Sequence, residues 1–285
     1  MLGMSEFRHW RRLMLCRPPM SCLRCPIQRV FAAIALLSFG AGLSAQEQTL
    51  RVLCYNIHHG EGVDGKVDLI RQAEVINSCS PDLVALQEVD DKTERTGRID
   101  QTARLAELTG LNGRFVHQLD FEGGRYGQAI LSKFPISEVT LHWLPGMPDR
   151  ERRIAGAVVV QVNDLKLTFV TPHLHHNNES FRQQQSSQLN QVFAKHTEML
   201  GLPLILAGDL NATPDSQPLR TLREEWQSAT EGQADMLTFP AVKPERQLDY
   251  ILTRPKGRIA VRSVKVINEH VASDHCPLFA EVAIQ

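Results

Sequence analysis

Apolar residues recur along the chain at two periods, and these periods predict where strands and helices lie. Alternation predicts a strand over residues 50–56, and an apolar run after a Pro-Asp turn predicts another within PDLVALQEV, residues 81–89. The helical spacing of Leu69, Ala73 and Ile76 predicts a helix over residues 67–79. DQTARLAELTG predicts a second helix that ends at Gly110.

The remainder of the chain is dominated by strand-like segments. One long, Gln-rich helix is predicted over residues 179–195, and Asn163-Asp164 predicts a hairpin turn. Because strands outnumber helices and several neighbours read as antiparallel, the pattern favours mixed sheets with helices outside over a parallel doubly wound sheet. No linker interrupts residues 46–285, which predicts one domain. The strands are expected at residues 114–117, 128–132, 138–143, 154–162, 165–171, 203–211, 248–253, 259–267 and 277–284.

The first 45 residues differ in composition from the rest. They contain six arginines and a single acid, Glu6, and the uncharged stretch VFAAIALLSFGAGLSA follows at residues 30–45. A basic start, an apolar centre and a small-residue end are typical of a secretory signal peptide, which predicts export to the periplasm or beyond. The apolar stretch is short for a spanning helix of about 20 residues. An uncleaved N-terminal membrane anchor is the alternative.

Net charge and cysteine content limit the binding partners and the disulfide bonds that are expected. The chain has 31 basic and 32 acidic residues; the leader holds six and one of these, so the remainder has 25 and 31, a net charge near −6. Nucleic-acid binders usually carry a basic patch or a high pI, so a nucleic-acid partner is not favoured, although a local patch stays open. A membrane is expected to be contacted only through an uncleaved leader, and the protein is expected to be a monomer. Cys54, Cys79 and Cys276 allow one disulfide of undetermined pairing.

Polar residues stand at the ends of several predicted strands. Each has an ordinary explanation by itself, as a turn former, a cap, a solvated strand end or part of a His-rich loop. Together they predict one shared site at an edge of a sheet, where ligands tend to bind. These residues are Asn56, Glu88, His173, Asp209, Asn211, Asp249, Asp274 and His275.

The residue types in this set suit phosphoester chemistry. Asn56, Glu88 and Asp274 offer the oxygen ligands that Mg²⁺ prefers, and a metal neutralises the charge of a phosphoester. Asp209, Asp249 and His275 can align and deprotonate a water, and His173 can bind a phosphoryl oxygen or protonate the leaving group. Asp209 and Asn211 are expected on an extended backbone, both pointing past Leu210 toward the same place.

The chain resembles the endonuclease/exonuclease/phosphatase superfamily of DNase I-like metal-dependent phosphohydrolases. The resemblance spans residues 50–282 and implies an α/β fold, a four-layer sandwich of two mixed β-sheets packed face to face with helices outside. It rests on LRVLCYNIHHGEG, PDLVALQEVD, YGQAILSKFPI, VTPHLHHNNESFRQQQ, LILAGDLNATPDS, LDYIL and SDHCPL, in that order.

The resemblance also implies a role for each residue of the site. Glu88 would bind the metal, with Asn56 in the metal and phosphate shell and Asp274 beside the metal. Asp209 would position or activate the water, and Asn211 would hold the phosphate. Asp249 would orient His275, which would act on the scissile phosphate.

The chain departs from the family pattern at three positions. The part of the site that would bind the leaving group is therefore less well defined than the part that would bind the metal. Pro172 stands where relatives often have Thr, His175 where they often have Asp, and Gln128 where they often have Asn. The acidic set favours Mg²⁺, with Mn²⁺ as the alternative. Imidazoles prefer transition metals, so the histidines near the motifs would shift this preference if they were ligands. They are His58, His59, His175 and His176.

The expected function is a metal-dependent phosphohydrolase that cleaves a phosphodiester or phosphomonoester with an activated water. The acidic chain favours a small or lipid-derived phosphoester, with a secreted nuclease as the alternative. A non-catalytic binding protein that keeps the fold is a third hypothesis, although Glu88, Asp209 and His275 are all present. A calcineurin-like dinuclear phosphatase would need a GNH motif, which the sequence lacks.

Overall fold

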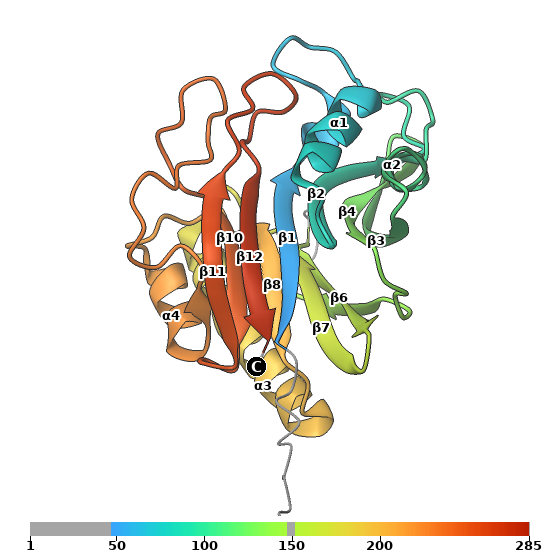
Figure 1. Ribbon diagram of the computed structural model, residues 1–285. Coiled ribbons are helices and arrows are strands. Elements are labelled where there is room, and N and C mark those ends of the chain that lie inside the picture. Colours follow the sequence, from blue (N-terminus) through green and yellow to red (C-terminus); the bar gives the residue numbers. More distant parts are fainter. Residues whose placement is uncertain (1–46, 147–151, 285) are drawn as a thin grey trace, which may run out of the picture. The chain divides into compact units, whose positions relative to one another are not determined.

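Two mixed β-sheets of six strands each form the centre of the structure in the described part of the chain (Figure 1). The computed structural model describes residues 47–146 and 152–284, so the predicted leader lies outside it. The described residues belong to one compact unit, Ala45–Gln285. Strand order is β11-β12-β1-β2-β4-β3 in the first sheet and β5-β6-β7-β8-β10-β9 in the second.

Each sheet contains one parallel pair, β1 with β2 and β7 with β8, and antiparallel pairs otherwise. The first sheet consists of β1 (Gln48–Asn56), β2 (Leu83–Asp91), β3 (Asn112–Phe121), β4 (Gly124–Ser132), β11 (Ile259–Val266) and β12 (Leu278–Ile284). The second consists of β5 (Thr140–Trp143), β6 (Ile154–Val162), β7 (Leu165–Pro172), β8 (Leu204–Asp209), β9 (Gln227–Ser228) and β10 (Asp249–Arg254).

Helices cover the outer faces of both sheets. They are α1 (Leu69–Cys79), α2 (Gln101–Thr109), α3 (Glu179–Leu200) and α4 (Gln217–Glu225), and a 3-10 turn, η1, spans His58–Gly60. Apolar side chains of the two sheets pack against each other in a central layer. A second layer packs the first sheet on α1 and α2, and a third packs the second sheet on α3 and α4. The predicted four-layer α/β sandwich is therefore confirmed.

Capping residues decide where the helices begin and end. α1 begins at Leu69, two residues later than predicted, because the Asp68 carboxylate accepts hydrogen bonds from the backbone N–H groups of Ile70 and Arg71. α3 continues to Leu200, beyond the predicted end, and stops at Gly201 with a φ of 63°. α4 and the two-residue β9 were not predicted, because β9 is too short for a pattern and α4 has only nine residues, of which few are apolar.

Two further expectations can be compared with the structure. The hairpin at Asn163-Asp164 is confirmed, with Val162 paired to Leu165 and Asn163 in the left-handed region that such turns require. Cys54, Cys79 and Cys276 are free thiols, so the disulfide that the sequence allowed is not formed. Among residues 47–146 and 152–284, no helix combines the length and the apolar character that crossing a membrane requires.

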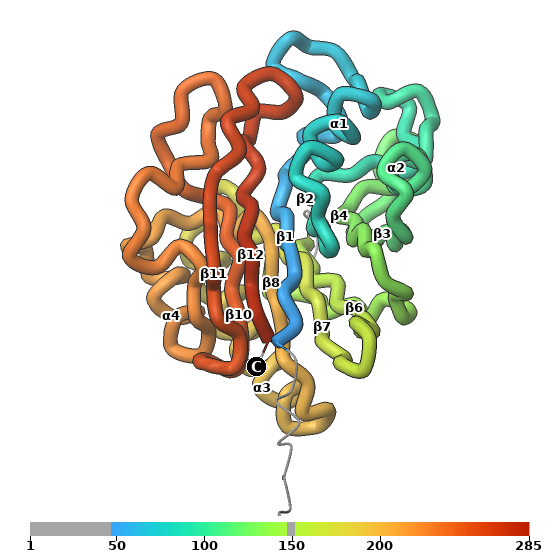
Figure 2. Tube along the Cα trace, in the orientation of Figure 1, coloured from blue at the N-terminus to red at the C-terminus, as the bar shows by residue number. Residues whose placement is uncertain are grey.

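The chain topology brings the motif-bearing loops to one edge of the sandwich. β1 ends and β12 begins at the upper edge in Figure 1. Figure 2 shows the loops formed by residues 57–68, 229–248 and 267–277 rising at this same edge. Because these loops adjoin β1, β10 and β12, the polar residues at those strand ends gather there.

Candidate active site

Asn56 joins the two sheets at this edge by hydrogen bonds to two carboxylates. Its side-chain Nδ2 donates to Glu88 Oε1 on the neighbouring strand at 3.1 Å and to Asp209 Oδ2 on the second sheet at 3.2 Å. Its Oδ1 accepts from the backbone N–H of His58 at 3.1 Å. Asn56 and Asp209 are about 1% exposed, so this contact lies in the floor of the site.

Glu88 was expected at the end of a strand, but it lies within one. β2 continues to Asp91, and Glu88 forms a bulge between Gln87 and Val89, where the pairing with β4 shifts register. Its φ of 58° is unusual for a residue with a side chain. Bulges re-aim side chains, and here the carboxylate turns to Asn56 instead of following the alternation of the strand.

Asp209, Asp249 and His275 form a buried cluster. Asp249, the first residue of β10, pairs directly with Asp209, the last residue of β8. His275 Nδ1 lies 2.8 Å from Asp249 Oδ2, and its Nε2 lies 3.8 Å from Asp209 Oδ2. The imidazole therefore faces both carboxylates and can hold a positive charge between them.

The electrostatics of this cluster follow from its burial and from its mixture of charges. Burial raises the pKa of Asp209 to about 7; the His275 charge opposes the rise, and the Asp249 carboxylate adds to it. Burial on its own lowers the pKa of His275, but Asp249, Asp209 and Asp274 outweigh it and raise the pKa to about 10. At neutral pH, His275 is therefore cationic, and burial makes the Asp209 carboxylate more basic than an ordinary aspartate.

His173 is a neutral hydrogen-bond donor at the other side of Asp209. Its Nδ1 lies 3.1 Å from Arg153 Nη1, and a guanidinium can only donate, so Nδ1 accepts. The ring proton is therefore on Nε2, which lies 3.4 Å from Asp209 Oδ2 and 3.1 Å from Asn211 Nδ2. Because Nε2 and the Asn211 amide nitrogen are then both donors, the contact between them is not a hydrogen bond, and Nε2 donates toward Asp209. Burial and the Arg153 charge lower the pKa of His173 well below its ordinary value, which keeps the ring neutral.

Asn211 reaches the site by a different route from the predicted one. The expectation of an extended backbone from Asp209 to Asn211 is wrong, because β8 ends at Asp209 and Asn211 has a φ of 47°. The Asp209 carboxylate accepts the Asn211 backbone N–H at 2.8 Å, and Asn tolerates this left-handed turn well. Asn211 Nδ2 lies 3.1 Å from His173 Nε2, so the two side chains nevertheless converge.

A close contact between β7 and β8 places His173 beside Asp209. A Cβ on Gly208 would lie 2.2 Å from the carbonyl oxygen of Pro172, so only glycine allows the strands to approach this closely. The pairing continues one residue past β7, as an isolated bridge between His173 and Asp209. Gly208 thus explains why the apolar run of β8 is interrupted just before the site.

The structure places the remaining predicted residues less centrally. Asp274 is half-buried and hydrogen-bonded to Ser273 Oγ at 3.4 Å. Among the described residues, it belongs to neither cluster of side chains close enough to share a metal. Gln128 is buried and donates to Gln118 Oε1 at 3.0 Å, not to a predicted site residue. His175 stacks on His176 beyond His173.

Two residues of the site escaped the sequence analysis. Arg153 is only 3% exposed and contacts both His173 and His176. Ser273 Oγ donates to the carbonyl oxygen of Asn56 at 2.7 Å and accepts the His275 backbone N–H at 3.3 Å. The only sequence signal for Arg153 was a charged residue directly before a mostly apolar strand. The motif SDH contains Ser273 without indicating its contacts.

Two pockets flank the site. One of about 380 Å³ is lined by His58, His59, Glu88, Arg95, Leu119, Phe121 and Tyr126. The other, of about 360 Å³, contains Asn211 together with Arg182 and Arg246. A wider hollow of about 650 Å³ between Asp91 and Arg125 contains none of the predicted site residues, so its size says nothing about the chemistry.

Comparison with solved structures finds the same fold in several proteins. An endonuclease/exonuclease/phosphatase from Beutenbergia cavernae is 24% identical, with a TM-score of 0.66 over 83% of this chain and 72% of that one. A family protein from Bacteroides thetaiotaomicron is 18% identical, with a TM-score of 0.70 over 84% and 96% of the two chains. A mannosyl-6-phosphatase from Bacteroides thetaiotaomicron is 19% identical, with a TM-score of 0.68 over 82% and 99%.

Comparison with sequences agrees at the level of the family. No curated protein sequence matched the chain. The model of the Endonuclease/Exonuclease/phosphatase family matches residues 53–275, which include every predicted site residue. Together with the four-layer sandwich, this match shows that the chain belongs to the endonuclease/exonuclease/phosphatase family, whose members are phosphoester hydrolases.

Proposed function

We propose that the protein is a metal-dependent hydrolase of small or lipid-derived phosphoesters that uses an activated water. The observation that carries this proposal is the environment of Asp209 Oδ2. This one oxygen lies within 3.2–3.8 Å of nitrogen atoms of Asn56, His173 and His275. Asp209 can act as the base, with His173 as a neutral donor and His275 as a cationic donor beside it. This arrangement suits the attack of water on the phosphorus of an anionic phosphoester.

The oxygen donors beside Asp209 fit a divalent cation. Glu88 contributes a half-buried carboxylate, and Asn56 contributes a carboxamide oxygen whose single hydrogen bond, from His58 N–H, leaves a second lone pair. Such hard donors suit Mg²⁺, and Mn²⁺ is also compatible with them. When bound, the cation would neutralise phosphoester charge as a Lewis acid.

The side chains of the chain divide the remaining work. Asp209, once ionised, accepts the proton of the attacking water. His275 keeps Nδ1 on Asp249, so its Nε2–H is the cationic donor available to a phosphoryl oxygen. His173 Nε2–H and the Asn211 amide offer neutral donors on the other side, where Arg153 and the Asp209 carboxylate hold them in place.

The two pockets that flank the site, of about 380 and 360 Å³, suit a small substrate. Arg182 and Arg246 line the pocket beside Asn211 together with Glu179 and Asp215, so the two guanidinium groups share this pocket with two carboxylates. The other pocket combines Arg95, which is paired with Asp90, with the rings of Phe121 and Tyr126. The net charge near −6 for residues 46–285 gives no overall attraction to a nucleic acid. One solved protein with this fold is a mannosyl-6-phosphatase, which is consistent with a phosphatase role.

A hydrolysis panel with the purified protein tests this proposal. The substrates are p-nitrophenyl phosphate, bis-p-nitrophenyl phosphate, sphingomyelin, inositol phosphates and plasmid DNA, each with Mg²⁺, Mn²⁺ or EDTA. We expect turnover of a small or lipid-derived ester that EDTA abolishes and that Asp209→Asn loses. Preferential cleavage of plasmid DNA would establish the nuclease alternative. Metal-dependent binding without any turnover would indicate a non-catalytic protein.

A further inference from the structure

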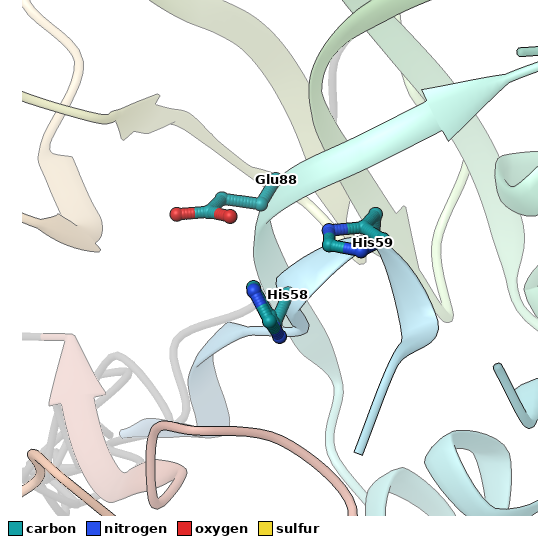
Figure 3. Close-up of side chains that lie close together, drawn as sticks. All are labelled: His58, His59 and Glu88. Carbon is teal, nitrogen blue, oxygen red and sulfur yellow. The ribbon is translucent and has the colours of Figure 1, made fainter. Parts of the chain in front are cut away.

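We propose that His58, His59 and Glu88 form a binding site for a divalent transition metal, one that takes nitrogen as well as oxygen ligands. This inference deepens the proposed function and rests on it, because Glu88 belongs to both sites. One ligand atom from each of the three residues lies within 4.8 Å of the others. In Figure 3, each imidazole turns one nitrogen toward the space beside the Glu88 carboxylate.

The hydrogen bond of His58 leaves its second nitrogen free to bind a metal. His58 Nδ1 lies 3.3 Å from the backbone carbonyl oxygen of Glu61, which can only accept, so Nδ1 carries the proton. The other ring nitrogen, Nε2, therefore has an available lone pair. Metal-binding histidines are usually oriented in this way, by a backbone carbonyl or a carboxylate at the opposite nitrogen.

His59 shows the same arrangement in a more buried position. Its Nε2 lies 3.4 Å from Glu61 Oε2, so a neutral ring donates from Nε2 to the carboxylate and leaves a lone pair on Nδ1. Nδ1 is buried and has no hydrogen-bond partner among the described residues, and the whole residue is 8% exposed. A buried acceptor without a partner is costly, and a bound metal ion would satisfy it.

The backbone holds all three residues in unusual conformations. His58, His59 and Glu88 have φ values of 45°, 44° and 58°. Left-handed residues with side chains cost energy and often mark ligand sites. Gln101 fixes this part of the chain, because its Nε2 donates to the His59 carbonyl oxygen at 2.7 Å and its Oε1 accepts from the Asp90 N–H at 2.9 Å.

The site opens into a pocket, so coordination positions would remain for water or substrate. The pocket of about 380 Å³ includes His58, His59 and Glu88 in its lining. Arg95 also lines it, but this cation is paired with Asp90 by two hydrogen bonds of 2.7 and 2.8 Å. The pair therefore limits the repulsion that the guanidinium would exert on a bound ion.

Two imidazoles and a carboxylate point to the class of metal. Imidazole suits first-row transition metals such as Co²⁺ and Zn²⁺, whereas Mg²⁺ prefers oxygen ligands and keeps several waters. The side chains therefore predict selectivity for a transition metal over Mg²⁺. That preference can be measured by binding, without any substrate.

The test is a titration of the purified, metal-free full-length protein with Co²⁺ and with Mg²⁺. Calorimetry gives the affinity for each ion, and visible absorption reports nitrogen ligands on Co²⁺. The variants are His58→Asn and His59→Asn, because Asn tolerates the left-handed backbone, with His58→Gly as a second variant. His117→Ala is the matched control, since His117 is a partly exposed histidine that pairs with Asp120.

We expect the wild type to bind Co²⁺ more tightly than Mg²⁺. Each Asn variant should lose at least the roughly 10- to 100-fold in Co²⁺ affinity that disturbing a ligand's surroundings costs, with a changed absorption spectrum. The Mg²⁺ affinity of the Asn variants should stay at the wild-type value. The His117→Ala control should bind both ions with wild-type affinity. The inference would be overturned if all three His58 and His59 variants bound Co²⁺ with the affinity and spectrum of the wild type. If metal-dependent turnover persists in these variants, the proposed function still stands.

Discussion

Asp249 lies directly opposite Asp209 across the antiparallel β8–β10 pair, and both carboxylates are almost completely buried. Two buried carboxylates this close would repel each other if nothing lay between them. His275 faces both, at 2.8 Å from Asp249 and 3.8 Å from Asp209. The imidazolium is therefore part of what stabilises the folded site, as well as a candidate catalytic group.

The first prediction is a pH-dependent loss of stability. The pKa of His275 is about 10 in the folded protein and near 6.5 when unfolded, so its stabilisation is complete below pH 6.5 and is lost as pH rises through 10. His275→Gln should be less stable than wild type at pH 6, by on the order of a few kcal/mol. Urea unfolding in EDTA should show this gap closing by pH 10; a gap that is constant or grows with pH would contradict the assignment.

The second prediction concerns the contact between Gly208 and Pro172. Gly208→Ala should push β7 and β8 apart and move His173 away from Asp209, because the new Cβ would lie 2.2 Å from the Pro172 carbonyl oxygen. Misplacement by about 1 Å can cost on the order of 10²-fold in rate, so kcat/KM should fall to that extent. Gly146→Ala, where a Cβ would meet no described residue closer than 4.0 Å, is the control. Equal activity of the two variants would show that this contact is not needed.

The third prediction assigns Arg153 to positioning His173. Removing the guanidinium with Arg153→Met should raise the pKa of His173 and release the tautomer that the 3.1 Å contact fixes. Turnover should fall by about 10- to 100-fold with a smaller change in KM, and Arg153→Lys should restore part of it. The ¹⁵N shifts of the His173 ring distinguish the tautomers by NMR. An unchanged Nε2–H tautomer in Arg153→Met would rule this role out.

The sequence predicted the fold well because the strands carry strong periodicity. β1, β6 and β12 were found within two residues of their ends, and the mixed four-layer arrangement followed from the family motifs. Boundaries were less accurate where a cap decides them, as at Asp68 and Gly201. α4 was missed because its nine residues contain few apolar positions.

The site was predictable in composition but not in detail. Residue types and spacing identified Asp209 and Asn211, but only tertiary structure turns Asn211 back to His173 through a left-handed residue. The same holds for the bulge at Glu88. Arg153 follows Arg152 in the sequence, and its place directly before β6 is a weak signal that does not reveal its burial.

The fourth prediction concerns export, which we propose from the Arg-rich start and the apolar residues 30–45. Protein purified from its native host should carry a new N-terminus near Gln46, because the small residues before it are typical of a cleavage site. Mass spectrometry of the intact protein reads this directly. Soluble cytoplasmic protein that begins at Met1, Met14 or Met20 would refute export.

The fifth prediction separates the side chain that we propose binds the metal from those that we propose act on the phosphate. Glu88→Gln keeps the shape of the side chain but removes its charge, so it should weaken metal binding, and high Mg²⁺ should restore part of the activity. His275→Ala should lower turnover by on the order of 10² to 10⁴ with no rescue by metal. Asp249→Asn should behave like His275→Ala, and the double variant should lose little more, because the two residues act as a unit.

Turnover of a phosphodiester as a function of Mg²⁺ concentration, measured for wild type and these four variants, tests the central claim most directly. The account predicts that Mg²⁺ rescues Glu88→Gln alone, and that the effects of His275→Ala and Asp249→Asn are not additive. Equal rescue of Glu88→Gln and His275→Ala, or simple additivity in the double variant, would contradict this division of the site into a metal ligand and a hydrogen-bonded pair that acts on the phosphate.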